Sequence, residues 1–115
     1  MNSVAVKRGD VVTVAMSGDY GKPRPAIVVQ SDGFSGTESL LVCLSTTDRR
    51  DFPLYRLPVE PSPTNGLRDP SDVVADKIIA VPRHKLGRVI GALDAEALAT
   101  LTTMMTALIG AGDQG

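Results

Sequence analysis

The chain has 115 residues and a formal net charge of −1, with 43% hydrophobic and 22% charged residues. These values are typical of one globular domain, residues 1–115, and argue against a basic protein that coats nucleic acid regardless of sequence. Aromatic residues make up only 3%, so the core must be aliphatic. The chain shows no signal peptide and no apolar run of membrane-spanning length, so a cytoplasmic protein without a membrane partner is expected.

Short hydrophobic segments rich in β-branched residues predict a series of strands. The segments 17–22, 31–39 and 60–70 have the composition of flexible turns and loops, and the last of these contains three prolines. Short strands separated by turns favour a mainly β fold, a small antiparallel barrel or sandwich. The strands are expected at 11–16, 24–30, 40–44, 54–59, 71–75 with 77–81, and 87–93.

The end of the chain changes to a helical period. Asp94 is suited to cap the N-terminus of a helix, and Leu93 and Leu98 are spaced to form a hydrophobic staple across it. Gly110 can end the helix in the left-handed conformation. We therefore expect a C-terminal helix packed on the barrel, with one apolar face formed by Leu98, Leu101, Met104, Met105, Leu108 and Ile109.

A cation stands on a stiff segment at the mouth of the second predicted strand. Arg24 lies between Pro23 and Pro25, and the two prolines hold its backbone extended. A guanidinium fixed in this way suits a carboxylate or a phosphate. The alternative is an ordinary loop arginine that precedes a strand.

Three hydroxyl residues, Ser45, Thr46 and Thr47, follow the third predicted strand. If the second and third strands form an antiparallel hairpin, these hydroxyls and Arg24 meet at one edge of the sheet, where they can bind a phosphate. The alternative is that the hydroxyls satisfy the backbone of their own turn.

Common enzyme signatures are missing from the sequence. It contains no P-loop, no dinucleotide-binding glycine pattern and no zinc-ligand spacing, so no cofactor and no metal are expected. His84 is predicted to be a solvated residue among basic neighbours, and Cys43 a buried core residue. A Cys43–His84 pair is the open alternative.

The order of these segments resembles the MazF/PemK family of toxins over nearly the whole chain. The likeness is carried by residues 8–12, 22–29, 41–47, 66–67, 75–77 and 90–94, followed by the final helix.

This resemblance implies an SH3-like small antiparallel barrel with a C-terminal α-helix, working as a homodimer. It implies a metal-independent endoribonuclease that cuts single-stranded RNA, such as messenger RNA, at short motifs and leaves 2′,3′-cyclic phosphate and 5′-hydroxyl ends. It also implies a cognate antitoxin whose acidic C-terminal tail occupies the RNA groove. By position, Arg24 and Thr46 match the catalytic residues, and the residues expected to contact RNA are Lys22, Ser45, Thr47 and Arg49. For Arg49 the alternative is a solvated surface residue without a role in RNA binding.

Two other functions compete with the ribonuclease. A CcdB-type toxin, which poisons gyrase without cutting RNA, is similar in fold but uses a C-terminal tryptophan, and this chain has no Trp. A barrel that binds peptides needs a groove lined with aromatic side chains. The four aromatic residues of this chain are too few to make such a groove the favoured interpretation.

Overall fold

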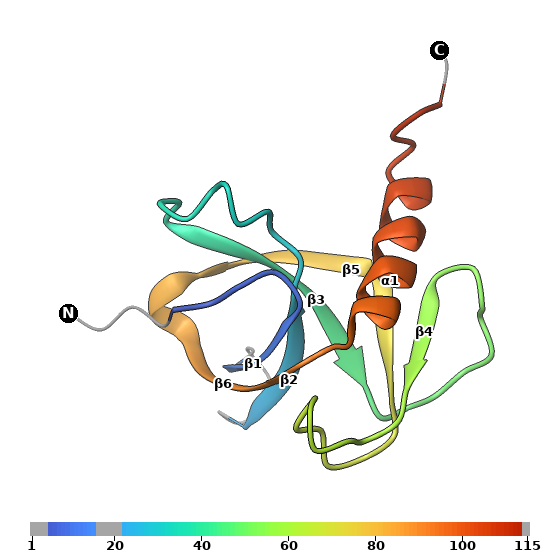
Figure 1. Cartoon of the computed structure of the whole chain (residues 1–115), viewed down its shortest axis with the longest axis horizontal. Coiled ribbons are helices and arrows are strands. Elements are labelled where there is room, and N and C mark those ends of the chain that lie inside the picture. The colour runs from blue at the N-terminus through green and yellow to red at the C-terminus, as the bar shows by residue number, and fades with distance from the viewer. Residues whose placement is uncertain (1–4, 16–21, 114–115) are drawn as a thin grey trace.

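The computed structural model describes residues 5–15 and 22–113. Six antiparallel strands form one sheet in the order β4-β5-β3-β2-β1-β6, and a helix follows the last strand (Figure 1). The elements are β1 (Asp10–Ala15), β2 (Pro23–Val28), β3 (Ser39–Thr46), β4 (Arg56–Val59), β5 (Ser71–Pro82), the 3₁₀ turn η1 (Arg83–Lys85), β6 (Leu86–Ala92) and α1 (Ala95–Leu108).

All the predicted elements are present, and the mainly β class with a C-terminal helix is confirmed. The fourth strand begins later than predicted, because residues 52–56 form a turn in which the N–H groups of Tyr55 and Arg56 both donate to the carbonyl of Phe52. Residue 16 of the first predicted strand and residues 17–21 of the predicted flexible stretch lie outside the described residues.

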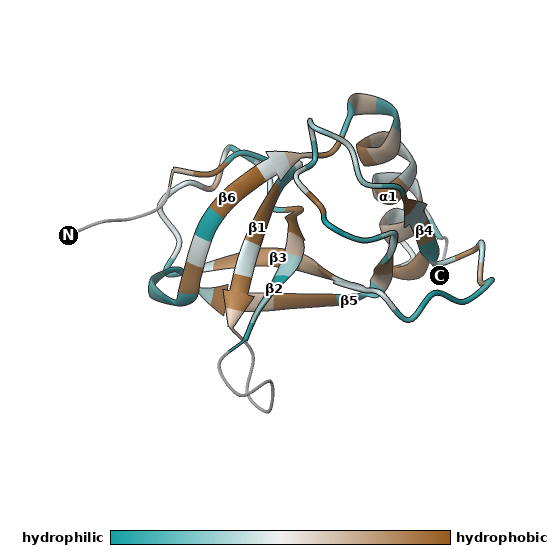
Figure 2. Ribbon diagram, turned by 90° about the horizontal axis from the view of Figure 1, so that it is seen from below, coloured by the Kyte–Doolittle hydropathy of each residue, from teal (hydrophilic) through white to brown (hydrophobic). Residues whose placement is uncertain are grey.

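Both faces of the curved sheet are covered, so side chains that point to either face of β1 are buried. Val11 belongs to one apolar cluster and Val12 and Val14 to a second, and all three are fully buried. The first cluster lies between the sheet and α1, where it includes Leu101 and Met105. The second is enclosed by the curve of β1, β2, β3 and the far half of β5, and much of β1 and β5 is brown, hence hydrophobic, in Figure 2.

Strand β5 changes its register against β3 near its middle. Cys43 faces Ile78, whereas Ser45 faces Val73, so β5 contains three more residues than β3 over this step. An insertion of this kind bends a strand. The bend lets the first half of β5 pair with β4 while it also flanks the end of β3.

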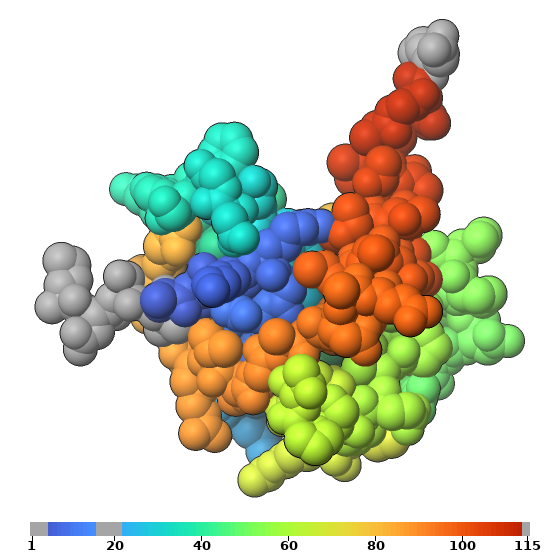
Figure 3. Space-filling model, viewed as in Figure 1, coloured from blue at the N-terminus to red at the C-terminus, as the bar shows by residue number. Residues whose placement is uncertain are grey.

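Helix α1 begins as predicted, since the Asp94 side chain accepts a hydrogen bond of 2.8 Å from the Ala97 N–H. Gly110 follows its last turn with a φ of +72°, the left-handed conformation expected of a helix-ending glycine. The prediction of one buried apolar face is wrong for Leu108 and Ile109, which are 45% and 71% exposed. These two side chains are exposed because the C-terminal end of α1 projects beyond the sheet (Figures 1 and 3).

In the part of the chain that the structure describes, no helix is both long and apolar enough to cross a membrane.

Candidate active site

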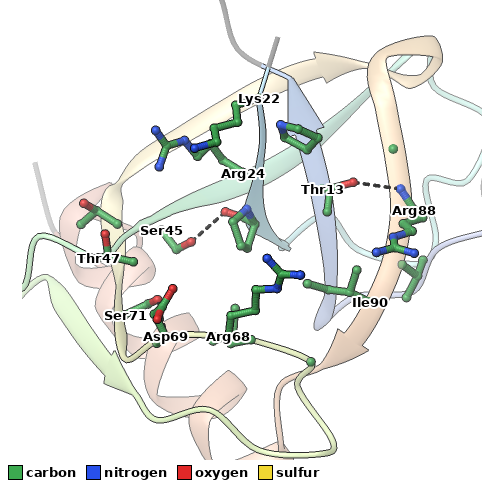
Figure 4. A pocket seen from close by; sticks show the side chains of 17 residues that line it. Thr13, Lys22, Arg24, Ser45, Thr47, Arg68, Asp69, Ser71, Arg88 and Ile90 are labelled. Carbon is green, nitrogen blue, oxygen red and sulfur yellow. Dashed lines mark hydrogen bonds between the residues drawn. The ribbon is translucent and has the colours of Figure 1, made fainter. Parts of the chain in front are cut away.

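A groove of about 1060 Å³ opens at the edge of the sheet where β2 begins and β3 ends (Figure 4). Strand β6 and the connection between β4 and β5 complete its walls. Its lining consists of Thr13, residues 22–25, 45–47 and 66–69, Ser71, and residues 87–90.

The two strand ends expected to meet do meet in this groove. Strands β2 and β3 are antiparallel neighbours with Ala26 opposite Leu44. One residue farther along, the Ser45 hydroxyl donates a hydrogen bond of 2.7 Å to the carbonyl of Pro25. The predicted antiparallel pairing of the two strands is therefore confirmed, and Arg24 and Thr46, which lie beyond the last paired residues, both line the groove.

The Arg24 side chain is exposed, while its backbone in β2 is paired with strand β1. It lies opposite Val14 of β1, and Pro25 lies opposite Thr13. The prolines therefore do not end the strand, and the guanidinium starts from a backbone that the sheet fixes.

The three hydroxyl residues have different surroundings. Ser45 is committed to the carbonyl of Pro25, and the Thr46 Oγ1 accepts a hydrogen bond of 3.0 Å from the Asp48 N–H. The alternative that these hydroxyls satisfy the backbone of their own turn is thus wrong for Ser45, whose partner lies on the neighbouring strand, and correct for Thr46. The Thr46 hydroxyl accepts that bond and can still donate its proton to a substrate oxygen. Thr47 is exposed and lines the groove.

The groove holds more positive charge than the sequence analysis predicted. Lys22 and Arg24 were expected, but Arg68 from the β4–β5 connection and Arg88 from β6 line it as well. One carboxylate, that of Asp69, lines the same groove. No local motif marks Arg68 or Arg88, because their neighbours in sequence are ordinary and only folding brings them to the site.

Glycines allow β6 and the β4–β5 connection to approach this closely. A Cβ atom on Gly87 would lie 2.1 Å from the Thr13 Oγ1, which accepts a hydrogen bond of 3.1 Å from the Arg88 N–H. Gly66 has a φ of +70°, and a Cβ atom there would lie 2.1 Å from the carbonyl oxygen of Ile90. Position 66 therefore requires glycine, and a side chain at position 87 would displace the Thr13 hydroxyl.

A Gly87→Ala variant is expected to break the Thr13–Arg88 contact, because the added methyl group occupies the space of the Thr13 hydroxyl. Overpacking of this kind typically costs about 1–3 kcal/mol. Chemical denaturation measures the loss, and Gly36→Ala, where nothing lies within 4 Å of the added Cβ, is the control. Equal stability of the two variants would show that the close approach is not required.

Asp72 organises the segment that follows β3. Its carboxylate is 2% exposed and accepts hydrogen bonds from the Arg50 N–H at 2.9 Å, Nη1 of Arg56 at 3.3 Å and Nε of Arg49 at 3.4 Å. Burial by itself raises the pKa of Asp72, but these donors outweigh it and hold the pKa below its ordinary value.

This lowered pKa predicts the pH dependence of stability. An aspartate has a pKa of about 3.9 in an unfolded chain, so the ionised Asp72 stabilises the fold above that pH. Its contribution is lost as the pH falls through the lower folded-state pKa. We expect an Asp72→Asn variant to be less stable than the wild type at neutral pH, and the difference to shrink in acid.

The measurement is urea denaturation of the wild type and of Asp72→Asn, from neutral pH down into acid. A stability difference that stays constant with pH would contradict the role of the Asp72 charge.

Comparison with known proteins identifies the family. Residues 7–109 match the model of the PemK-like, MazF-like toxin of type II toxin-antitoxin systems. The chain belongs to this family. It is 43% identical over 89 residues to a protein named probable endoribonuclease MazF from Mycolicibacterium smegmatis, covering 76% of this chain and 82% of that protein.

Solved structures of PemK/MazF toxins share the fold. A mycobacterial endoribonuclease in complex with its cognate antitoxin superposes with a TM-score of 0.77 at 22% identity, covering 93% of this chain and 97% of that one. The Mycobacterium tuberculosis toxin MazF-mt6 gives a TM-score of 0.73 at 25% identity, covering 87% and 95%. The family resemblance inferred from the sequence is confirmed, and the CcdB-type alternative is not favoured.

The groove contains all but one of the site residues expected from the MazF/PemK resemblance. The groove brings together Lys22, Arg24, Ser45, Thr46 and Thr47. Arg49 is absent from its lining, and its guanidinium pairs instead with Glu60 at 2.8 Å and with Asp72 at 3.4 Å.

His84 and Cys43 lie apart from the groove of this MazF/PemK chain and from each other. His84 is exposed on η1, as predicted. Cys43 is fully buried, and its Sγ lies 2.9 Å from the Val74 carbonyl oxygen. Burial, and secondarily the charge of Asp76, raises the pKa of the Cys43 thiol to about 12, so no Cys43–His84 pair forms.

Proposed function

We propose that this toxin endoribonuclease binds single-stranded RNA in the groove and cuts it at a short motif by attack of the RNA's own 2′-hydroxyl, without a metal ion. The observation that carries the proposal is the presence of Arg24 and Thr46 in one groove, which further cations also line. Membership of the PemK/MazF family supports it. The expected products carry a 2′,3′-cyclic phosphate on one side and a 5′-hydroxyl on the other.

In this mechanism the enzyme supplies charge and position, and the substrate supplies the nucleophile. The 2′-hydroxyl gives its proton to water as its oxygen bonds to the adjacent phosphorus, and the bond from phosphorus to the 5′-oxygen breaks as that oxygen takes a proton from water. Arg24 stabilises the negative charge that develops on the phosphorane and on the departing oxygen. It does not act as the base, because a guanidinium is not deprotonated in proteins.

The threonine hydroxyls and Lys22 then hold the RNA chain in place. Thr46 donates to a nonbridging phosphate oxygen, and Thr47 and Lys22 contact the flanking backbone. Ser45 lines the groove, and its hydroxyl holds the Pro25 carbonyl in place through the hydrogen bond of 2.7 Å. We assign Arg49 to support of the loop after β3, since Glu60 and Asp72 occupy its guanidinium.

The proposal is tested by incubating the protein with mixed-sequence single-stranded RNA in EDTA and mapping the chemistry of the product ends. We expect cuts at a short motif that leave cyclic phosphate. The matched control is Lys85→Ala, which removes an exposed cation outside the groove and should cut like the wild type. Products with 3′-hydroxyl ends, or no cutting by folded protein, would overturn the proposal.

The antitoxin belongs to the same proposal. Related toxins have been solved with their cognate antitoxins, and the cations of this groove complement an acidic peptide. We propose that the acidic tail of an antitoxin occupies the groove and excludes RNA. We further propose that the toxin works as a homodimer and acts in the cytoplasm, where messenger RNA is found.

A further inference from the structure

Two of the groove's cations stand apart from the proposed catalytic pair. In Figure 4, Lys22 and Arg24 lie on one side of Thr13 and Arg88 lies on the other, while Arg68 reaches into the groove from the β4–β5 connection. Sequence and family resemblance assigned neither Arg68 nor Arg88 a role.

The backbone holds both of these arginines in place. Arg88 donates its N–H to the Thr13 hydroxyl at 3.1 Å, which ties it to the neighbouring strand β1. Arg68 follows Leu67, whose side chain is buried and whose N–H donates to the Asn65 side chain at 2.9 Å. The guanidinium groups therefore start from ordered positions although Arg68 lies in a connection.

The connection that carries Arg68 is itself fastened to β6. The Ala92 N–H donates to the Thr64 carbonyl at 2.9 Å, and a Cβ atom on Gly91 would lie 2.4 Å from the backbone of Asn65. Figure 3 shows the connection packed against β6, as lime atoms beside orange ones. Arg68 and Arg88 are thus carried by one rigid wall.

Neither guanidinium is neutralised by a carboxylate within residues 5–15 and 22–113. Arg49, Arg50 and Arg56 each form an ion pair there, whereas Arg68 and Arg88 form none, although Asp69 lines the same groove. Two like charges on one wall repel each other, so a bound anion between them is favoured.

The position of this wall relative to Arg24 places it away from the proposed scissile phosphate. Val14 of β1 lies opposite Arg24 on one side and opposite Leu86 on the other, so the backbones of β2 and β6 are separated by two strand spacings, about 10 Å. Arg24 and the Arg68–Arg88 wall therefore face different points along an RNA chain that lies in the groove.

We propose that Arg68 and Arg88 together bind a backbone phosphate next to the one that is cut. This inference rests on the proposed function and adds to it a substrate requirement: an efficient substrate carries a phosphate beyond the scissile one. A dinucleotide, which has only the scissile phosphate, leaves this subsite empty.

The test compares Arg68→Ala, Arg88→Ala and the double variant on two RNAs that share the two nucleotides on either side of the scissile phosphate. One RNA is a dinucleotide with a single phosphate, and the other extends in both directions. Hydrogen bonds to charged groups contribute about 1.5–3 kcal/mol, so each single variant should raise KM for the longer RNA about tenfold or more. The loss in kcat/KM should be at least about tenfold greater for the longer RNA than for the dinucleotide, and kcat should change far less than KM.

Salt dependence gives a second readout. Each phosphate contact on a single strand contributes about 0.7 to the slope of log K against log salt concentration, so the double variant should show a shallower slope. Lys85→Ala, which removes the same charge outside the groove, should keep the wild-type slope, and thermal denaturation checks that each variant folds. Equal losses on both RNAs, or a fall in kcat with unchanged KM, would overturn the subsite.

Binding separates this inference from the proposed function. Affinity for an uncleavable 2′-O-methyl RNA is measured for the wild type and the double variant. If the wild type cuts neither RNA, the proposed function fails, while weaker binding by the double variant but not by Lys85→Ala still supports the subsite. Equal binding by the wild type and the double variant would overturn it.

Discussion

Replacing Arg24 with alanine is expected to lower kcat/KM for RNA cleavage by about a hundredfold or more. Losing one preorganised donor to a developing negative charge typically has an effect of that size. The side chain is exposed and its backbone is paired with Val14 of β1, so the fold should persist. Single-turnover cleavage of a motif-containing RNA measures the loss, and thermal denaturation confirms the fold.

Arg24→Lys is the matched variant, because it keeps the charge and removes the planar fork. We expect it to recover only a small part of the activity. Full activity in Arg24→Lys would show that charge alone suffices, and full activity in Arg24→Ala would place the chemistry elsewhere.

Replacing Leu101 with alanine is expected to lower the free energy of unfolding by about 2–5 kcal/mol. Leu101 is fully buried in the cluster between α1 and the sheet, so its removal leaves a cavity. Domains of this kind are stable by only about 5–15 kcal/mol, so the loss is a large fraction of the total. Urea denaturation at neutral pH is the measurement.

Ile109→Ala at the end of the same helix is the control. Its side chain is 71% exposed, and a surface substitution changes stability by about 0.5 kcal/mol or less. A comparable loss from both variants would mean that the projecting end of α1 is covered in solution, and a small loss from Leu101→Ala would contradict the packing described for the helix.

The core of the candidate site could be predicted because it is local in sequence. Arg24 and Thr46 lie at the open ends of two strands that follow one another, and consecutive antiparallel strands usually pair. The prolines around Arg24 and the hydroxyls after β3 are visible without a structure. The cap at Asp94 and the glycine at position 110 belong to the same local class.

The second wall of the groove could not be predicted because it depends on distant pairing. Strand β6 pairs with β1, which is the first strand of the chain, and this pairing brings Arg88 to Thr13. The contact between the Ala92 N–H and the Thr64 carbonyl, which fastens the connection carrying Arg68, is equally invisible in the sequence. Arg49 lies outside the groove lining, and its guanidinium pairs with Glu60 and with the buried Asp72 of β5, two partners that the sequence does not reveal.

The most direct test of the central claim uses an RNA that carries a single 2′-deoxynucleotide immediately before the scissile phosphate. If the substrate's 2′-hydroxyl is the nucleophile, the wild-type protein should bind this RNA as tightly as the unmodified strand and leave it uncut at that position. Cleavage there at the normal rate would contradict the account, because the nucleophile would then have to come from water or from the protein.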